Sequence, residues 1–220
     1  MSLFNIILQI HIVVGFIALV VGLVAMLAPK GQKIHNTAGK IYFGSMLIIA
    51  LTSTILSILG PLNLFLLVVG IFSFYLTFTG YRTTRVKNQA PQLIDKLVTG
   101  LMLATTVAIV FLNIYFWNNG KQNLTIILSI FGTIGGTLAL ADVWRYFKGY
   151  NHPKEWLLAH LGRMCGAYIA TFTAFAVTNL TAFFPKMLLW TVPAVAGALT
   201  IQLATTYYRK RYNIPKKSSK

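Results

Sequence analysis

The sequence predicts an all-α membrane protein: a polytopic bundle of about seven transmembrane helices, with its N-terminus outside and its C-terminus in the cytoplasm. Three observations carry this prediction. The 220 residues are 56% hydrophobic and only 10% charged, a composition that soluble domains of this length do not have. The apolar residues come in runs of roughly 20, the length that spans a bilayer. The basic residues gather in alternate loops, as they do on the cytoplasmic side of a membrane.

The apolar runs place the spans in order. The first run is too long for the core of a signal peptide, which has about 7–15 apolar residues, and is interpreted as a retained helix. The second stops at Gly60-Pro61, a pair that breaks helices. We predict spans at about 3–28, 37–59, 62–81, 94–117, 123–143, 156–180 and 185–207. Residues 1–207 then form one transmembrane domain, and residues 208–220 form a basic cytoplasmic tail.

The charge of the chain indicates its side of the membrane. There are 19 Lys and Arg residues against 3 Asp and Glu residues, for a formal net charge of +16. Short cytoplasmic loops are enriched in Lys and Arg, so the charge is interpreted as a topology signal and not as a sign of nucleic-acid binding. The tail YYRKRYNIPKKSSK is expected to contact anionic lipid.

Small residues recur within the spans, above all Gly132, Gly135 and Gly136 in the fifth. Such residues let membrane helices approach one another closely. Close packing is the favoured interpretation. The alternative is that these glycines make room for a flat cofactor.

The four histidines differ in predicted depth. The first span runs from outside to inside, which places His11 in its outer half. His35 begins the second span, His152 lies in the loop before the sixth, and His160 is about one turn into that span. With a rise of about 1.5 Å per residue, the last three share an inner layer, and His11 lies more than about 10 Å away from them.

Two imidazoles at one depth on different helices can ligate one b-type haem iron. His35 and His160 meet this condition and are the predicted metal ligands. Arg163 lies one turn after His160 and could pair with a haem propionate, and Gly39, one turn after His35, would leave room for the ring. His11 and Gly15 repeat that spacing and could mark a second site, for example for a quinone.

Other interpretations stay open. A zinc-dependent hydrolase could use His35, His152 and His160 with water, helped by Asp95 or Asp142. A transporter could pass protons between a histidine and Asp142 or Glu155, although Asp95 and Asp142 are expected near span ends, where water solvates them. The histidines could also be structural, and Arg163 could reach the membrane surface along its own aliphatic stem.

The segments HIVVGFIALVVGLVAML, KIHNTAGKIYFGSM and HLGRMCGAYIATFTAF resemble a bacterial integral-membrane family described only as a predicted membrane protein of unknown function. The resemblance implies a multi-span fold with a set of histidines, and no reaction. Asn36 stands where that family usually has a basic residue after its second histidine. The matching positions are His11, Gly15, His35, Gly39, Tyr42, His160, Met164 and Tyr168.

Taken together, these observations predict a multi-pass protein of the cell (inner) membrane. The leading hypothesis is a small b-type haem protein that moves electrons between a membrane carrier, such as a quinone, and a redox partner. The site residues would be His35, His160 and Arg163, with His11 as a further cofactor-binding candidate. The alternatives are a transporter or scaffold with structural histidines, and a zinc hydrolase.

Overall fold

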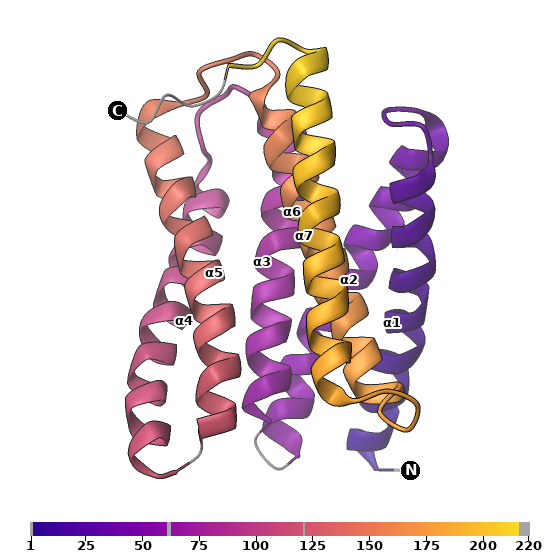
Figure 1. Ribbon diagram of the computed structural model, residues 1–220, viewed down its shortest axis with the longest axis vertical. Coiled ribbons are helices and arrows are strands. Elements are labelled where there is room, and N and C mark those ends of the chain that lie inside the picture. Colours follow the sequence, from indigo (N-terminus) through magenta and orange to yellow (C-terminus); the bar gives the residue numbers. More distant parts are fainter. Residues whose placement is uncertain (1, 61–62, 121, 216–220) are drawn as a thin grey trace. The chain divides into compact units, whose positions relative to one another are not determined.

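The computed structural model describes residues 2–60, 63–120 and 122–215, and its regular structure there is entirely helical. In these ranges seven helices follow one another along the sequence (Figure 1). The all-α prediction is therefore confirmed. The helices are α1 (Leu3–Leu27), α2 (Lys33–Leu59), α3 (Leu64–Val86), α4 (Leu93–Asn118), α5 (Gln122–Lys148), α6 (Glu155–Asn179) and α7 (Lys186–Arg211).

Six of the seven helices are long and apolar enough to cross a membrane. The exception is α6, which has 25 residues, more than the roughly 20 that a span needs. It carries Glu155, His160 and Arg163, and these polar side chains lower its hydropathy. The length of α6 supports the predicted sixth span, at about 156–180, and its composition does not.

Several helices continue past the predicted spans. α2 begins at Lys33, α3 continues to Val86, and α5 continues to Lys148. The added turns carry basic residues, which water and headgroups solvate while the backbone hydrogen bonds of the helix continue. An apolar run therefore predicts the part of a helix that lies in lipid, and the helix extends beyond that part.

Local capping accounts for several of the helix ends. The Ser2 hydroxyl accepts from the backbone N–H of Asn5 at 3.3 Å, and the Asn63 side chain accepts from Leu66 N–H at 3.0 Å. At α4, Gln92 and Asp95 form a reciprocal capping box. These side chains satisfy backbone donors that a helix start leaves without an intrahelical partner.

The chain divides into two compact units, and the boundary falls within α3. The first unit contains residues 1–75 and 91–147, and the second contains residues 76–90 and 148–220. In the first, α1 packs against α2, and Val68, Ile109, Phe116 and Leu128 form a buried apolar cluster between α3, α4 and α5. In the second, α6 packs against α7.

Glycines in the first unit allow close helix contacts. A Cβ added to Gly132 would lie 2.9 Å from Ile109, and one added to Gly136 would lie 2.8 Å from Thr106. At Gly135, the added atom would lie 2.2 Å from the Met102 side chain. The close-packing interpretation of these three glycines is thus supported, because neighbouring side chains already fill the space beside them.

A matched pair of glycine substitutions tests this packing. Gly70→Ala should destabilise the protein by about 1–3 kcal/mol because of overpacking, since its Cβ would lie 2.1 Å from the Ser53 hydroxyl oxygen. Gly100→Ala meets nothing within 4 Å and should instead stabilise α4 by up to about 1 kcal/mol. Thermal unfolding in detergent measures both. Equal shifts in melting temperature would contradict the packing account.

Candidate functional site

His35 is held by the end of the helix before it. Its Nδ1 lies 2.8 Å from the backbone carbonyl oxygen of Ala25, in the last turn of α1, where carbonyl groups lack intrahelical donors. A carbonyl can only accept, so Nδ1 carries the proton and the lone pair of the neutral ring is on Nε2. Lys30 supports the same turn, with its Nζ 3.2 Å from the Ala25 carbonyl oxygen. His35 therefore helps to cap α1 and has a defined tautomer.

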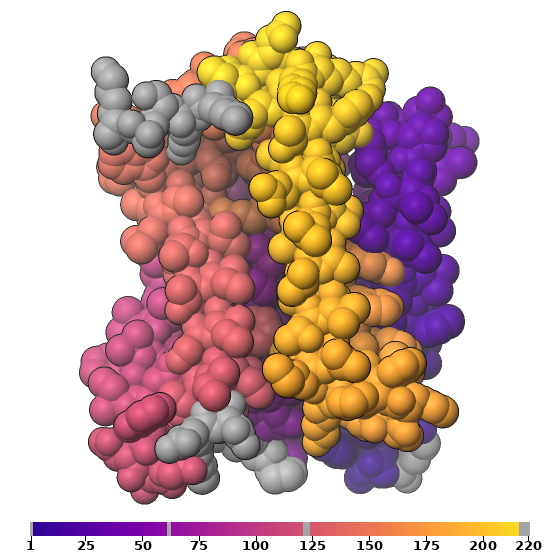
Figure 2. Space-filling model, viewed as in Figure 1, coloured from indigo at the N-terminus to yellow at the C-terminus, as the bar shows by residue number. Residues whose placement is uncertain are grey.

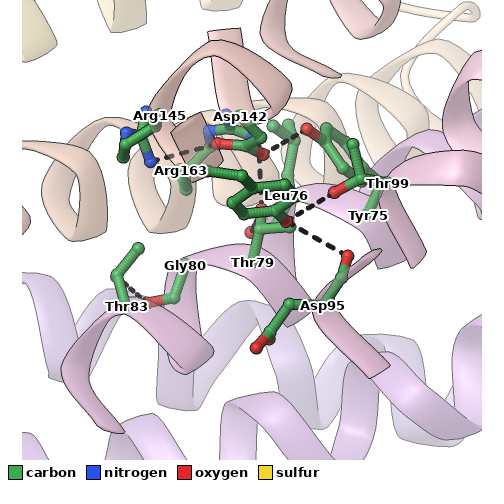
Figure 3. Close-up of polar contacts among 11 residues, drawn as sticks. Tyr75, Leu76, Thr79, Gly80, Thr83, Asp95, Thr99, Asp142, Arg145 and Arg163 are labelled. Carbon is green, nitrogen blue, oxygen red and sulfur yellow. Dashed lines mark hydrogen bonds and ion pairs between the residues drawn. The ribbon is translucent and has the colours of Figure 1, made fainter. Parts of the chain in front are cut away.

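His160 has the same arrangement in the second unit. Its Nδ1 lies 2.8 Å from the backbone carbonyl oxygen of Gly80 in α3, which again assigns the proton to Nδ1 and the lone pair to Nε2. The Thr83 hydroxyl donates to the same carbonyl at 2.7 Å (Figure 3). The contact depends on glycine at position 80, because an added Cβ would lie 2.9 Å from both Arg163 Cβ and Met164 Sδ.

His11 is held through a hydroxyl. Its Nδ1 lies 2.8 Å from Thr52 Oγ1, and that hydroxyl lies 2.8 Å from the Ile48 carbonyl oxygen. A hydroxyl has one proton. When Thr52 donates it to Ile48, its oxygen accepts from His11 Nδ1–H. The three histidines within helices then share one tautomer, with the lone pair on Nε2.

His152 differs from the other three histidines. The backbone N–H of Lys154 donates to its Nδ1 at 3.1 Å, so the proton of the neutral ring is on Nε2. This is a local contact in the loop before α6, between residues two positions apart. A structural role accounts for it.

Gly15 and Gly39 each lie four residues after a histidine, and close helix packing does not explain either glycine. A Cβ added to Gly15 or to Gly39 meets nothing within 4 Å. In this they differ from Gly80 and the glycines of α5, where a side chain already occupies the space. The space one turn from His11 and one turn from His35 is therefore open, and a flat group beside either imidazole stays a prediction from the sequence.

Arg163 is buried at 4% exposure and donates to Thr79 Oγ1 at 3.2 Å (Figure 3). The interpretation that its side chain reaches the membrane surface is wrong. A fully ionised guanidinium keeps five N–H donors and needs partners inside the protein when buried. The hydroxyl of Thr79 is one of them.

Sequence reasoning missed a buried acid in the first unit. Asp142 in α5 was expected near solvent, but it is only 2% exposed and accepts a hydrogen bond from the hydroxyl of Tyr75, which is 1% exposed. Its other oxygen lies 3.0 Å from the guanidinium of Arg145 (Figure 3). Burial is tolerable here because a cation and a hydroxyl replace the lost water. The Asp-xx-Arg spacing on one helix face was the available signal.

Asp95 is also buried, and its role is structural. Its carboxylate accepts from the backbone N–H of Gln92 at 2.8 Å as part of the capping box. Its backbone carbonyl accepts from the Tyr146 hydroxyl at 3.1 Å, and Thr99 lies 2.8 Å from the same hydroxyl. These bonds join the start of α4 to the end of α5. The expectation that water solvates Asp95 is therefore also wrong.

No three His, Cys, Asp or Glu side chains form a group that could hold a metal ion within the described ranges. The zinc alternative combines His35 of the first unit with His152 and His160 of the second, and it stays a prediction from the sequence. Haem needs two axial ligands at most. His35 belongs to the first unit and His160 to the second, and their common depth stays a prediction from the sequence.

A family described as "Predicted membrane protein (DUF2306)" matches residues 8–145, well over half of the chain. The chain belongs to this family. The match confirms the resemblance to an integral-membrane family of unknown function. It includes His11 and His35, and it ends before His152 and His160. Comparisons with curated proteins and with solved structures found no significant match.

A threonine pair in α2 tests the hydrogen bond that orients His11. Thr52→Val should destabilise this DUF2306 protein by about 1–3 kcal/mol, because His11 Nδ1–H loses its acceptor. Thr54→Val is the matched control, since the Thr54 hydroxyl bonds the Ala50 carbonyl of its own helix. Thermal unfolding of the two variants in detergent gives the comparison. If Thr54→Val destabilises the protein as much, the bond from His11 to Thr52 does not orient the ring.

Proposed function

We propose that this membrane protein binds haem b and transfers electrons within the cell (inner) membrane, with His35 and His160 as axial ligands through Nε2. The observation that carries the proposal is the orientation of both rings. Each imidazole holds its Nδ1 proton against a backbone carbonyl at 2.8 Å. Histidines that ligate metals usually donate their other N–H in this way, which fixes the ring and makes Nε2 the ligand atom.

Two residues near the rings support the proposal. The open space beside Gly39 suits a flat ring next to His35. On α6, Arg163 follows His160 by three residues, and we assign it to a propionate because a guanidinium binds carboxylates with two parallel hydrogen bonds. The sharing of one iron by the two histidines is an inference from their predicted depth.

Haem with two axial histidines supplies a one-electron couple whose potential depends on hydrogen bonding and burial around the ligands. The chain contributes imidazoles whose rings are held by backbone carbonyl groups. His11, with open space beside Gly15, is proposed as a second cofactor-binding residue where a quinone would exchange electrons. A soluble or membrane redox partner would complete the transfer.

Proton-coupled transport is a second candidate, and the buried acid favours it. Asp142 connects a fully buried hydroxyl on Tyr75 to Arg145, whose side chain is 25% exposed. Ionisable groups within membrane helices often mark proton pathways. This candidate predicts a colourless protein whose activity depends on Asp142.

The visible spectrum separates the two candidates. After expression with ample haem, the protein purified in mild detergent should show a Soret band that shifts and sharpens with dithionite, and about one iron per chain, which is the ratio that two axial ligands to one haem require. His35→Ala and His160→Ala should each abolish the low-spin spectrum, while His152→Ala, whose ring has the opposite tautomer, should retain it. A colourless wild-type protein, or full haem in His160→Ala, would contradict the proposal.

A further inference from the structure

Three helix ends meet in the second unit and gather cations. At the end of α3, Lys87 Nζ lies 5.4 Å from the ring centroid of Trp156 at the start of α6. The neighbouring Asn88 side chain donates to the Pro153 carbonyl at 3.3 Å. From the same start of α6, Lys154 Nζ lies 5.6 Å from the ring of Tyr212, just after α7. These contacts bring residues more than 100 positions apart in the sequence into one surface.

We name this surface the basic cluster. It consists of four cations and the rings beneath them. Arg85 lies over Tyr81 at 5.2 Å and Arg211 over Tyr207 and Tyr212 at 6.0 Å each. Figure 2 shows the end of α7, in yellow, at the surface of the molecule. The members are Arg85, Lys87, Lys154 and Arg211, with Tyr81, Trp156, Tyr207 and Tyr212.

The basic cluster lacks a balancing acid. The second unit contains one acidic residue, Glu155, and its carboxylate accepts from the backbone N–H of Asn151 at 2.9 Å. Within the described part of the chain, no carboxylate lies at ion-pair distance from the four cations. All four are exposed. Among the described residues, the positive charge of the cluster is therefore available to an anion from outside the chain.

The segment after α7 is folded and holds part of the cluster in place. Asn213 adopts a left-handed conformation at φ 52°, which ends the helix as a glycine or asparagine commonly does. The Ile214 N–H then bonds the Arg209 carbonyl at 2.9 Å, and the Ile214 side chain is only 4% exposed. Arg211 and Tyr212 are thus part of an ordered turn, whereas a solvated tail would leave them loose.

The chemistry of the cluster matches a phospholipid headgroup. Trp and Tyr rings favour the level of the headgroups, where one edge is apolar and the other wet. A Lys ammonium has three donors and Arg has five, so a cation that contacts a ring on one side can still bind phosphate on the other. We infer that the basic cluster is a binding site for the phosphate headgroup of an anionic membrane lipid, independent of any haem.

Native mass spectrometry of the full-length protein, from nanodiscs with equal phosphatidylglycerol and phosphatidylcholine, tests this inference. The wild type should retain more phosphatidylglycerol than phosphatidylcholine. The triple variant Lys87→Gln, Lys154→Gln, Arg211→Gln should lose that preference, since each basic residue near a membrane surface contributes roughly fivefold in affinity for anionic lipid.

The matched control is Lys33→Gln, Lys40→Gln, Lys96→Gln, which removes the same charge from exposed positions in the first unit. It should retain phosphatidylglycerol like the wild type. An equal loss of phosphatidylglycerol preference in both triple variants would show that net charge alone attracts the lipid. That result would overturn the inference of a specific binding site. A wild type that retains both lipids equally would overturn the inference as well. Thermal unfolding of both variants checks that each is folded.

Discussion

The need to satisfy polar groups inside an apolar bundle is the constraint on which the structure depends. Lipid offers no hydrogen bonds, so a polar side chain within a span must find its partner in the protein. Each of the three helix histidines meets this need through Nδ1, against Ala25, Gly80 or Thr52. The same bonds tie α2 to α1 at two levels and α6 to α3. The hydrogen bonds that join these helices are therefore the same bonds that orient the imidazoles.

That coupling explains why structural and functional interpretations of the histidines are compatible. The nitrogen that holds the helices together is Nδ1, and the nitrogen that would ligate iron is Nε2. A histidine that caps α1 is already oriented as a ligand, because the carbonyl fixes both its tautomer and its ring direction. His152 lies in a loop and has the reverse tautomer, which separates it from the other three in chemistry as well as position.

Hydropathy predicts the helical architecture because each span is a continuous apolar run, and the glycines of α5 pack as predicted. Tertiary contacts are harder to predict. Nothing in the local sequence shows that the Gly80 carbonyl faces His160, since the two residues are 80 positions apart. Asp142 was expected in water because it lies near a span end. Its carboxylate is instead buried against the hydroxyl of Tyr75, which is 67 positions away in the sequence. The basic cluster likewise depends on the meeting of three helix ends.

The tautomers of the four imidazoles are the most direct test of this account. They can be measured by ¹⁵N nuclear magnetic resonance on protein labelled only at histidine, prepared without haem at a pH where the rings are neutral, with single histidine substitutions to assign the signals. The account predicts protonated Nδ1 in His11, His35 and His160, and protonated Nε2 in His152. Protonated Nε2 in His35 and His160 would contradict it, because neither ring could then be held by its carbonyl through Nδ1 or offer Nε2 as a ligand.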